Sequence, residues 1–360
     1  MSQSYNPQSN HTSRKKIYIA YTGGTIGMKP TANGFAPVPG FFTQELAKLS
    51  EVTDGDMPAY VVHEYSTLID SANISPQHWT QIAEDIRDHY NDYDGFVVIH
   101  GTDTMAYTAS ALSFMLENLA KPVILTGSQI PLRQLHSDAR DNLVGALFLA
   151  AHHPIPEVCL YFHNKLYRGN RTKKVDSNGF SAFDSPNFLP LFELGADVMK
   201  LQKTWSTEVL KQSNLNIQTI THSDVATLSV FPGIQARFVE HFLHQPLKGL
   251  VLQTYGMGNA PIHNSELMMA FHSASQRGII IVNCSQCLKG RVNMRGYEAG
   301  KILEDCGVIS GHDMTVEAAL TKLTYLLNKE STSKDEELNH CVKEIKELMQ
   351  ASLRGELTRN

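Results

Sequence analysis

The sequence has few cysteines, no long hydrophobic run and no surplus of positive charge, and each absence excludes a class of protein. Its 360 residues include five cysteines, an odd and sparse set that fits a reducing compartment rather than a disulfide framework. The longest apolar run, around 143–151, is about half of the roughly 18 residues that span a bilayer. Acidic residues outnumber Lys and Arg by 36 to 31, which argues against nucleic-acid binding. We therefore expect a soluble cytoplasmic protein with neither a nucleic-acid nor a membrane partner.

The composition is that of a globular chain, with 42% hydrophobic and 19% charged residues. The length fits one large domain or two. Residues 1–15 are polar and are expected to form a disordered tail. A polar stretch without periodicity predicts a linker at 202–215, which divides the chain into an N-terminal catalytic α/β domain at 16–201 and a C-terminal α/β domain at 216–360.

Short apolar runs alternate with helical segments along most of the chain. Continuous apolar runs are typical of parallel strands covered on both faces, and their alternation with helices predicts a mostly parallel α/β sheet. The fold class is therefore α/β, with a large N-terminal mostly parallel-sheet domain and a smaller C-terminal α/β domain. A capping box at Ser333 and Glu336 predicts an amphipathic C-terminal helix. The expected strands are 16–20, 95–99, 122–126, 158–162, 225–231, 249–252 and 279–282, and the expected helices are 76–90, 105–119 and 142–151.

Two segments place glycines and hydroxyls directly after predicted strands, at the sheet edge where open α/β folds bind ligands. They are Tyr21–Gly27 (YTGGTIG) and His100–Met105 (HGTDTM). Glycine lets backbone N–H groups approach a ligand closely. The first segment lacks the lysine of a P-loop and the spacing of a dinucleotide fingerprint, so a phosphate-binding role is poorly supported. Either segment alone is equally typical of a simple turn.

Considered together, the segments supply the groups that activate a hydroxyl nucleophile. Thr25 and Thr102 provide hydroxyls, Asp103 a carboxylate and Lys174 an amine. Each has a structural alternative. Thr25 can be a turn residue, Asp103 is also expected to cap the helix that follows, and Lys174 belongs to a basic cluster in which Lys173 is easily mistaken for it.

With these motifs in place, the sequence resembles the bacterial type I (cytoplasmic) L-asparaginases. The resemblance covers residues 16–358. The matching motifs are AYTGGTIGM (20–28), YDGFVVIHGTDTMAYTASALSFMLENL (93–119), VILTGSQIPL (123–132), LYRGNRTKK (166–174), YGMGNAP (255–261), VNCSQCLKGRVNM (282–294), DMTVEAALTKL (313–323) and LRGELT (353–358).

The resemblance implies hydrolysis of L-asparagine to L-aspartate and ammonia through a threonine β-acyl-enzyme intermediate, with no metal and no organic cofactor. By its place in the motif, Thr25 matches the family nucleophile. Thr102, Asp103 and Lys174 match the second catalytic cluster, in which Thr102 orients water or shares in proton transfer and Lys174 sets the proton affinity. The resemblance leaves open which threonine acts first.

The resemblance also implies how the substrate and the subunits are held. Asp70, Ser71 and Ala72 match the loop that grips the α-carboxylate and α-amine of asparagine, with Thr102 and Asp103 completing the substrate site. Backbone N–H groups near the two threonines would stabilise the oxyanion. The family assembles as a homotetramer, a dimer of dimers.

Two departures from the family pattern affect the expected site. The loop after the first motif usually carries a tyrosine whose hydroxyl orders the nucleophile, but here the residue is Phe35, so that bond is missing or comes from Tyr21 or another partner. Some members have an allosteric asparagine site built from an arginine, a threonine and a cysteine. The aligned positions are Gln253, Lys173 and Cys287, so the cysteine alone is kept.

Several other functions and roles are less favoured. The asparaginase-like subunit of an archaeal-type Glu-tRNA amidotransferase would carry an extra N-terminal domain, and an amino-acid sensor on this fold would be expected to lose Thr25 or Lys174. A dinucleotide-dependent oxidoreductase would need an acidic residue at the end of a second strand, and this sequence lacks it.

His100 is expected to be a buried, hydrogen-bonded residue rather than a base, and Cys284 and Cys287 are expected to be buried thiols rather than half of a zinc site.

Overall fold

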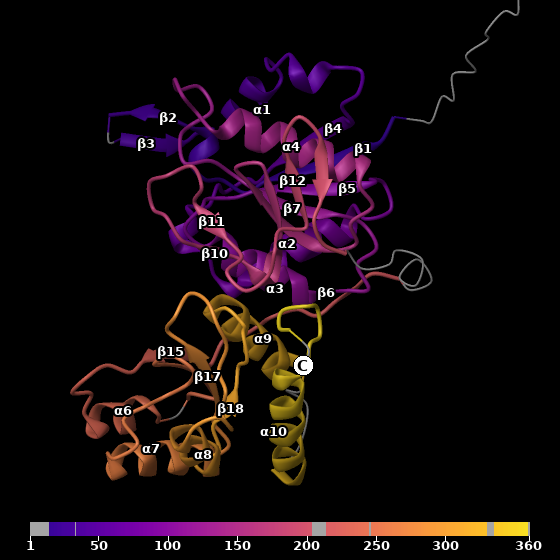
Figure 1. Ribbon diagram of the computed structural model, residues 1–360. Coiled ribbons are helices and arrows are strands. Elements are labelled where there is room, and N and C mark those ends of the chain that lie inside the picture. The colour runs from indigo at the N-terminus through magenta and orange to yellow at the C-terminus, as the bar shows by residue number, and fades with distance from the viewer. Residues whose placement is uncertain (1–13, 33, 204–213, 245, 330–334, 359–360) are drawn as a thin grey trace, which may run out of the picture.

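The computed structural model describes residues 14–32, 34–203, 214–244, 246–329 and 335–358 (Figure 1). Most of the expected tail at 1–15, most of the expected linker at 202–215, and Ser333 of the expected capping box lie outside the described residues. The domain limits therefore stay predictions. Figure 1 shows the N-terminal half around one large sheet, with a smaller sheet below it.

The larger sheet has eight strands, and five adjacent strands that reach one edge are parallel, so the sheet is mostly parallel, as predicted. Its spatial order is β13-β12-β9-β8-β7-β5-β1-β4. The parallel strands are β1 (Lys16–Tyr21), β4 (Ala59–Glu64), β5 (Gly95–Ile99), β7 (Val123–Thr126) and β8 (Val158–Phe162). The antiparallel edge is formed by β9 (Lys165–Arg168), β12 (Phe192–Leu194) and β13 (Val198–Lys200).

Helices cover both faces of this sheet, which explains why β5 and β8 are buried at every position. The helices α2 (Pro76–Asp88) and α3 (Met105–Met115) pack on one face, and α1 (Phe41–Leu46) and α4 (Ala139–His152) pack on the other. Ser75 caps α2 and Pro76 is its first residue. The helix α3 ends sooner than expected, because Leu116–Glu117 forms β6, which pairs with β14 (Asn216–Ile217).

The smaller sheet is entirely parallel and confirms the second α/β unit. Its strands are β15 (Val225–Ser229), β16 (Gly249–Thr254), β17 (Ile280–Ser285) and β18 (Ile309–Ser310). One face is covered by α6 (Ala236–Phe242), α7 (Ser265–Gln276) and α8 (Glu298–Asp305), and the other by α9 (Val316–Lys329) and α10 (Asp335–Gln350). The helix α9 also packs against α3, where the rings of Phe114 and Tyr325 lie 5.9 Å apart. No helix in the described part of the chain could cross a bilayer.

Candidate active site

Three loops meet at the carboxyl edge of the larger sheet, because they follow the adjacent parallel strands β1, β4 and β5. Thr22 ties the first loop to the third: its backbone N–H and its hydroxyl donate to the carbonyl oxygen of Ile99 at 3.1 and 2.9 Å. The carbonyl oxygen of Thr22 accepts from the N–H of Ile69 at 2.7 Å. The first loop is thus fixed between the other two.

Glycines allow these loops to approach closely enough to bring the predicted residues together. A Cβ added to Gly24 would lie 2.5 Å from the backbone nitrogen of Gly101, and one added to Gly101 would lie 2.4 Å from Oγ of Ser71. Gly24 also has φ +90°, a conformation that other residues rarely adopt. Thr25 and Thr102 directly follow these two touching glycines. Thr25 begins the short helix η1 (Thr25–Gly27) and is half-buried.

Lys174 reaches the same edge from a different part of the chain. It lies on β10 (Lys173–Lys174), which pairs with β11 (Phe183–Asp184). Its Nζ donates to Oγ1 of Thr102 and to Oδ1 of Asp103, both at 2.8 Å. The Lys174 side chain is 19% exposed, whereas that of Asp103 is 65% exposed. The ammonium group is therefore largely enclosed, and the carboxylate faces outward.

The substrate-loop residues predicted from the resemblance lie beside this cluster. The short helix η3 (Ser71–Asn73) is capped by Asp70, whose Oδ1 accepts from the N–H of Ala72 at 3.1 Å. Ser71 is 3% exposed, while Asp70 and Ala72 are exposed. The hydroxyl of Thr104 donates to the carbonyl oxygen of Ser71 at 2.7 Å, which joins this loop to the start of α3.

The expectation that Asp103 caps α3 is wrong. The N-cap residue is Thr104, and no side chain caps the helix by a hydrogen bond. The carboxylate of Asp103 instead accepts from Nζ of Lys174.

The sequence interpretation missed Gln129, which contacts Thr102 directly. The Thr102 hydroxyl donates to Oε1 of Gln129 at 3.3 Å, and Nε2 of Gln129 donates to the carbonyl oxygen of Gly179 at 3.1 Å. The backbone N–H of Gln129 is held by the carboxylate of Asp138. Gln129 follows β7, a neighbour of β5, so its position at a parallel-strand end was the available signal.

His100 is buried and hydrogen-bonded, as predicted. Its Nδ1 lies 2.7 Å from the carbonyl oxygen of Gly101, and its Nε2 lies 3.0 Å from the hydroxyl of Thr108. Since a carbonyl oxygen only accepts, Nδ1 carries the proton and Nε2 accepts from Thr108. Burial lowers the pKa of His100 to about 4, which keeps the ring neutral near pH 7.

Tyr21 does not replace the tyrosine hydroxyl that Phe35 lacks. Within the described residues the buried hydroxyl of Tyr21 has no hydrogen-bond partner, and its ring stacks on Phe42 at 4.5 Å. Phe35 lies on a hairpin of β2 (Met28–Thr31) and β3 (Gly34–Pro37), which follows η1 directly. Its side chain is 48% exposed.

The three positions aligned with an allosteric site differ in their surroundings. Nζ of Lys173 donates to Oε1 of the buried Glu317 at 3.0 Å. Gln253 and Cys287 lie near the ends of β16 and β17.

The prediction of buried thiols is confirmed for Cys284 and wrong for Cys287, which is exposed because it lies in the loop beyond the end of β17. Across the described ranges no group of three His, Cys, Asp or Glu residues could hold a metal ion.

Comparisons with known proteins agree with this arrangement. Residues 16–207 match the family model "Asparaginase, N-terminal", and residues 224–341 match "Glutaminase/Asparaginase C-terminal domain". The chain is 50% identical over 345 residues to L-asparaginase 1 of Escherichia coli, covering 96% of this chain and 98% of that one. It is 44% identical over 364 residues to the 60 kDa lysophospholipase of Homo sapiens, covering 96% of this chain and 62% of the relative.

Solved structures show the same fold over nearly the whole chain. The crystal structure of L-asparaginase I from Vibrio cholerae superimposes with a TM-score of 0.88 at 49% identity, covering 96% of this chain and 100% of that one. The thermostable L-asparaginase from Thermococcus kodakarensis gives a TM-score of 0.83 at 32% identity, with the same coverage. This chain, with its two matched domains and its loops joined at the carboxyl edge of the sheet, belongs to the asparaginase family.

Proposed function

We propose that this protein is an L-asparaginase, which hydrolyses L-asparagine to L-aspartate and ammonia through a threonine β-acyl-enzyme intermediate. The observation that carries the proposal is the contact of one lysine, Lys174, with both Thr102 and Asp103 at 2.8 Å, beside the loop that bears Thr25. Membership of the asparaginase family supports the choice of an amide substrate. The proposal needs neither a metal nor an organic cofactor.

In the first step Oγ of Thr25 attacks the side-chain carboxamide carbon of asparagine. A C–O bond forms and the C–N bond breaks, so the amide leaves as ammonia after it takes up the proton that Thr25 loses. Thr25 is half-buried at the start of η1, where glycine-rich backbone surrounds it. The N–H groups of that backbone would stabilise the negative charge on the carbonyl oxygen in the transition state.

In the second step water hydrolyses the β-aspartyl ester, which releases aspartate and restores the Thr25 hydroxyl. We assign the handling of water and protons to Thr102 and Lys174. The Thr102 hydroxyl accepts from Lys174 and donates to Gln129, so its direction is fixed by two partners. A hydroxyl held in this way can orient one water without reorganisation during the reaction.

The α-amine and α-carboxylate of asparagine are assigned to the loop at residues 70–72 and to Asp103. The exposed carboxylate of Asp103 is accessible to an ammonium group, while Ser71 and the backbone beside it would hold the carboxylate. These groups lie next to the two threonines because Gly101 packs on Ser71. The side-chain amide is then directed toward Thr25.

Ammonia release from L-asparagine by the purified protein tests the proposal. We expect turnover without added cofactor, and Thr25→Ala should reduce it by about a thousandfold or more, because the nucleophile is lost. Thr25→Ser is the matched control and should retain measurable activity, since it keeps a hydroxyl. With hydroxylamine present, the wild type should form aspartate β-hydroxamate from the acyl-enzyme.

Two results would contradict the proposal. One is a folded Thr25→Ala protein that keeps more than a tenth of the wild-type rate. The other is faster release of fatty acid from lysophosphatidylcholine than of ammonia from asparagine. The lipid is included because a relative bears the name lysophospholipase.

The proposal includes a cytoplasmic homotetramer, a dimer of dimers. The five cysteines are free thiols, which supports a reducing compartment. Exposed aromatic side chains on and near α6, namely Phe231, Phe238 and Phe242, support association of the chain with itself. Sedimentation equilibrium should give a mass near four chains.

A further inference from the structure

Residues 353–358, which we call the C-terminal clamp, follow α10 and lie between the two halves of the chain. Figure 1 shows the yellow segment that follows α10 between that helix and the N-terminal half. Gly355, Glu356 and Leu357 are buried. The contacts that bury them join the C-terminal half to a segment next to Lys174.

An ion pair anchors the clamp to the C-terminal half. Nζ of Lys322, on α9, lies 2.5 Å from Oε1 of Glu356, and both side chains are fully buried. Lys322 also donates to the carbonyl oxygen of Ala351, and the Glu356 carboxylate accepts the N–H groups of Leu353 and Arg354. Because both charges have further partners, the pair fixes the path of the clamp backbone.

The other side of the clamp holds the short helix η4 (Gly169–Arg171). Nε of Arg171 donates to the carbonyl oxygen of Gly355 at 2.7 Å, and Nη2 donates to the hydroxyl of Thr358 at 3.2 Å. Nδ2 of Asn170 donates to the carbonyl oxygen of Arg354 at 3.0 Å. The Arg171 side chain is 3% exposed. The buried guanidinium therefore depends on these partners, rather than on water, for its hydrogen bonds.

Asp313 completes the contact from the C-terminal half. Its Oδ2 accepts from Nη1 of Arg171 at 2.9 Å and from the hydroxyl of Thr358 at 2.5 Å, and its Oδ1 accepts from the N–H of Thr358 at 2.8 Å. Burial acts to raise the pKa of Asp313, but the bonds from Thr358 and Arg171 outweigh it and lower the pKa.

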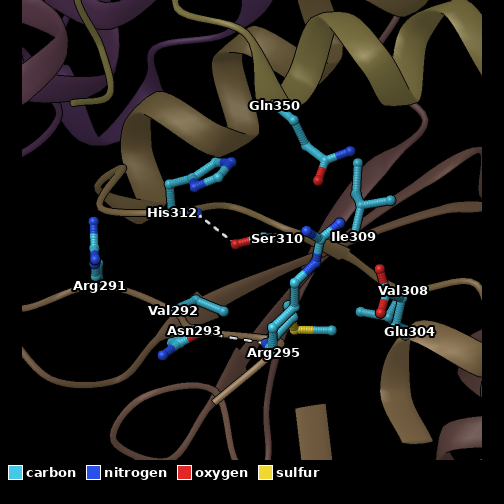
Figure 2. Close-up of a pocket in the computed structure, with 11 residues that line it drawn as sticks. Arg291, Val292, Asn293, Arg295, Glu304, Val308, Ile309, Ser310, His312 and Gln350 are labelled. Carbon is cyan, nitrogen blue, oxygen red and sulfur yellow. Dashed lines mark hydrogen bonds between the residues drawn. The ribbon is translucent and has the colours of Figure 1, made fainter. Parts of the chain in front are cut away.

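The loop that presents Asp313 is itself fixed. The N–H of His312 donates to Oγ of Ser310 at 3.1 Å, in the wall of a cavity of about 370 Å³ (Figure 2). The N–H of Val292 donates to the carbonyl oxygen of His312 at 2.9 Å. Asp313 thus acts as a fixed point for both Arg171 and Thr358.

Arg171 precedes Lys174 by three residues, and one residue separates η4 from β10. We propose that the C-terminal clamp is a positioning element of the active site, in which Thr358 and Asp313 hold Arg171, and η4 with it, so that Lys174 meets Thr102 and Asp103. This inference rests on the proposed function, because it assumes that Lys174 takes part in the reaction.

The physical need for such a support follows from the lysine side chain. Its ammonium group is at the end of a flexible four-carbon stem, so its position depends on the backbone from which it extends. A displacement of about 1 Å at a reacting group can reduce a rate by about a hundredfold. At the end of η4 the hydroxyl of Thr172 donates to the carbonyl oxygen of Gly169 at 2.7 Å. A displacement of Arg171 would therefore also displace the backbone of β10.

Thr358→Val, compared with Thr358→Ser, tests the inference. Valine has the shape of threonine but lacks the hydroxyl that joins Arg171 to Asp313. We expect kcat for asparagine to fall about 5- to 20-fold, with a change of less than threefold in KM. Serine keeps the hydroxyl and should restore kcat to within twofold of the wild type.

The pH profile of kcat separates positioning from a general loss of folded enzyme. Rates are therefore expressed per folded molecule, with the folded fraction measured by circular dichroism at each pH, so that a loss of folded enzyme leaves the profile unchanged. A displaced Lys174 changes its distance from the charged groups that face it, Asp103 and Asp176, and should move the profile by at least half a pH unit. An unmoved profile for a folded Thr358→Val protein with lowered kcat would overturn the inference.

Arg171→Lys gives a second measurement, checked for folding by circular dichroism. It keeps the positive charge but loses the planar fork, so kcat should fall at least as far as in Thr358→Val. Wild-type kcat and pH profile in Thr358→Val would overturn the inference even where Arg171→Lys fails to fold. If Lys174→Met keeps more than a tenth of the activity, the catalytic role that the proposed function gives to Lys174 is what fails. If Lys174→Met is inactive while Thr358→Val is unchanged, the clamp inference alone fails.

Discussion

At the scale of single residues, two adjacent lysines have separate partners. Nζ of Lys174 contacts Thr102 and Asp103, while Nζ of Lys173 contacts Glu317 on α9. Neighbouring residues on a strand point to opposite faces, which explains how one basic pair serves two sites. A sequence motif alone could not assign the two roles.

We predict that Lys174→Met damages turnover as severely as Thr102→Ala, and that the double variant is no worse than either. Residues that act as a unit have non-additive effects on rate. Lys173→Met is the matched control and should keep kcat near the wild-type value. Steady-state rates of ammonia release measure all four proteins. The reverse order of effects between the two lysines would show that their assignment is shifted by one residue.

A second prediction at this scale concerns acid stability. The pKa of His100 is about 4 in the folded protein, below the value of about 6.5 in an unfolded chain. Between these values the unfolded state binds a proton that the folded state does not. The free energy of unfolding should therefore fall by about 2 kcal/mol for this group as the pH drops from 7 to 5.

Denaturant unfolding of the wild type and of His100→Asn at both pH values measures that effect. Asparagine does not titrate, so the difference between pH 7 and pH 5 should be smaller in the variant by most of this amount. Equal pH dependence in the two proteins would assign acid sensitivity to other groups.

At the scale of elements, the turn between β1 and η1 depends on the absence of a side chain at Gly24. Its φ is +90°, and an added Cβ would lie 2.5 Å from the backbone nitrogen of Gly101. Gly34, on the nearby hairpin, has φ +104° but no atom within 4 Å of an added Cβ. An alanine at either position would have a strained positive φ, but only at position 24 would its Cβ clash with another loop.

We predict that Gly24→Ala loses at least a hundredfold in kcat, because the loops bearing Thr25 and Thr102 must separate. Gly34→Ala carries only the strain of positive φ, which costs roughly 1–2 kcal/mol, and should remain active. Thermal melts and rates on both variants provide the comparison. Similar kcat values for the two would mean that the close approach of the loops is not needed.

The strands predicted in the larger sheet end within one residue of the observed ones, because apolar runs and glycine turns are local patterns. In the smaller sheet the C-terminal ends of β15, β16 and β17 differ from the predicted ones by two or three residues. The sequence placed Thr25, Thr102 and Asp103 on loops that the structure brings to one edge. It did not find Gln129 or the clamp, because these contacts depend on folding: Arg171 and Gly355 are 184 positions apart. The solvent exposure of Cys287 was also missed, since a CxxC pattern does not show where a strand ends.

At the scale of the whole molecule, the two halves are joined by packing and by buried charge. The helix α3, which follows the loop of Thr102, packs on α9 of the C-terminal half. Lys173 and Arg171 both bind acidic residues of that half, at Glu317 and Asp313. A ligand that favoured one arrangement of the halves would therefore have a physical route to the active site.

We predict nevertheless that the rate depends hyperbolically on asparagine concentration. The family resemblance implies an arginine at the position of Gln253 in members that asparagine activates. A neutral amide binds a carboxylate more weakly than a guanidinium does, by roughly 1–2 kcal/mol, or about 5- to 30-fold in affinity. Lys173 cannot fully restore the charge, because its ammonium group is already bound to Glu317 at 3.0 Å.

Initial rates over a wide range of asparagine concentrations measure the curve. An effector shifts an equilibrium only as far as it binds one state better than the other, so a weakened site shifts little at concentrations that saturate catalysis. We expect a Hill coefficient near 1. A coefficient above about 1.5 that is lost in Cys287→Ala would mean that an effector site persists with different residues, and that Gln253 and Lys173 are no barrier to it.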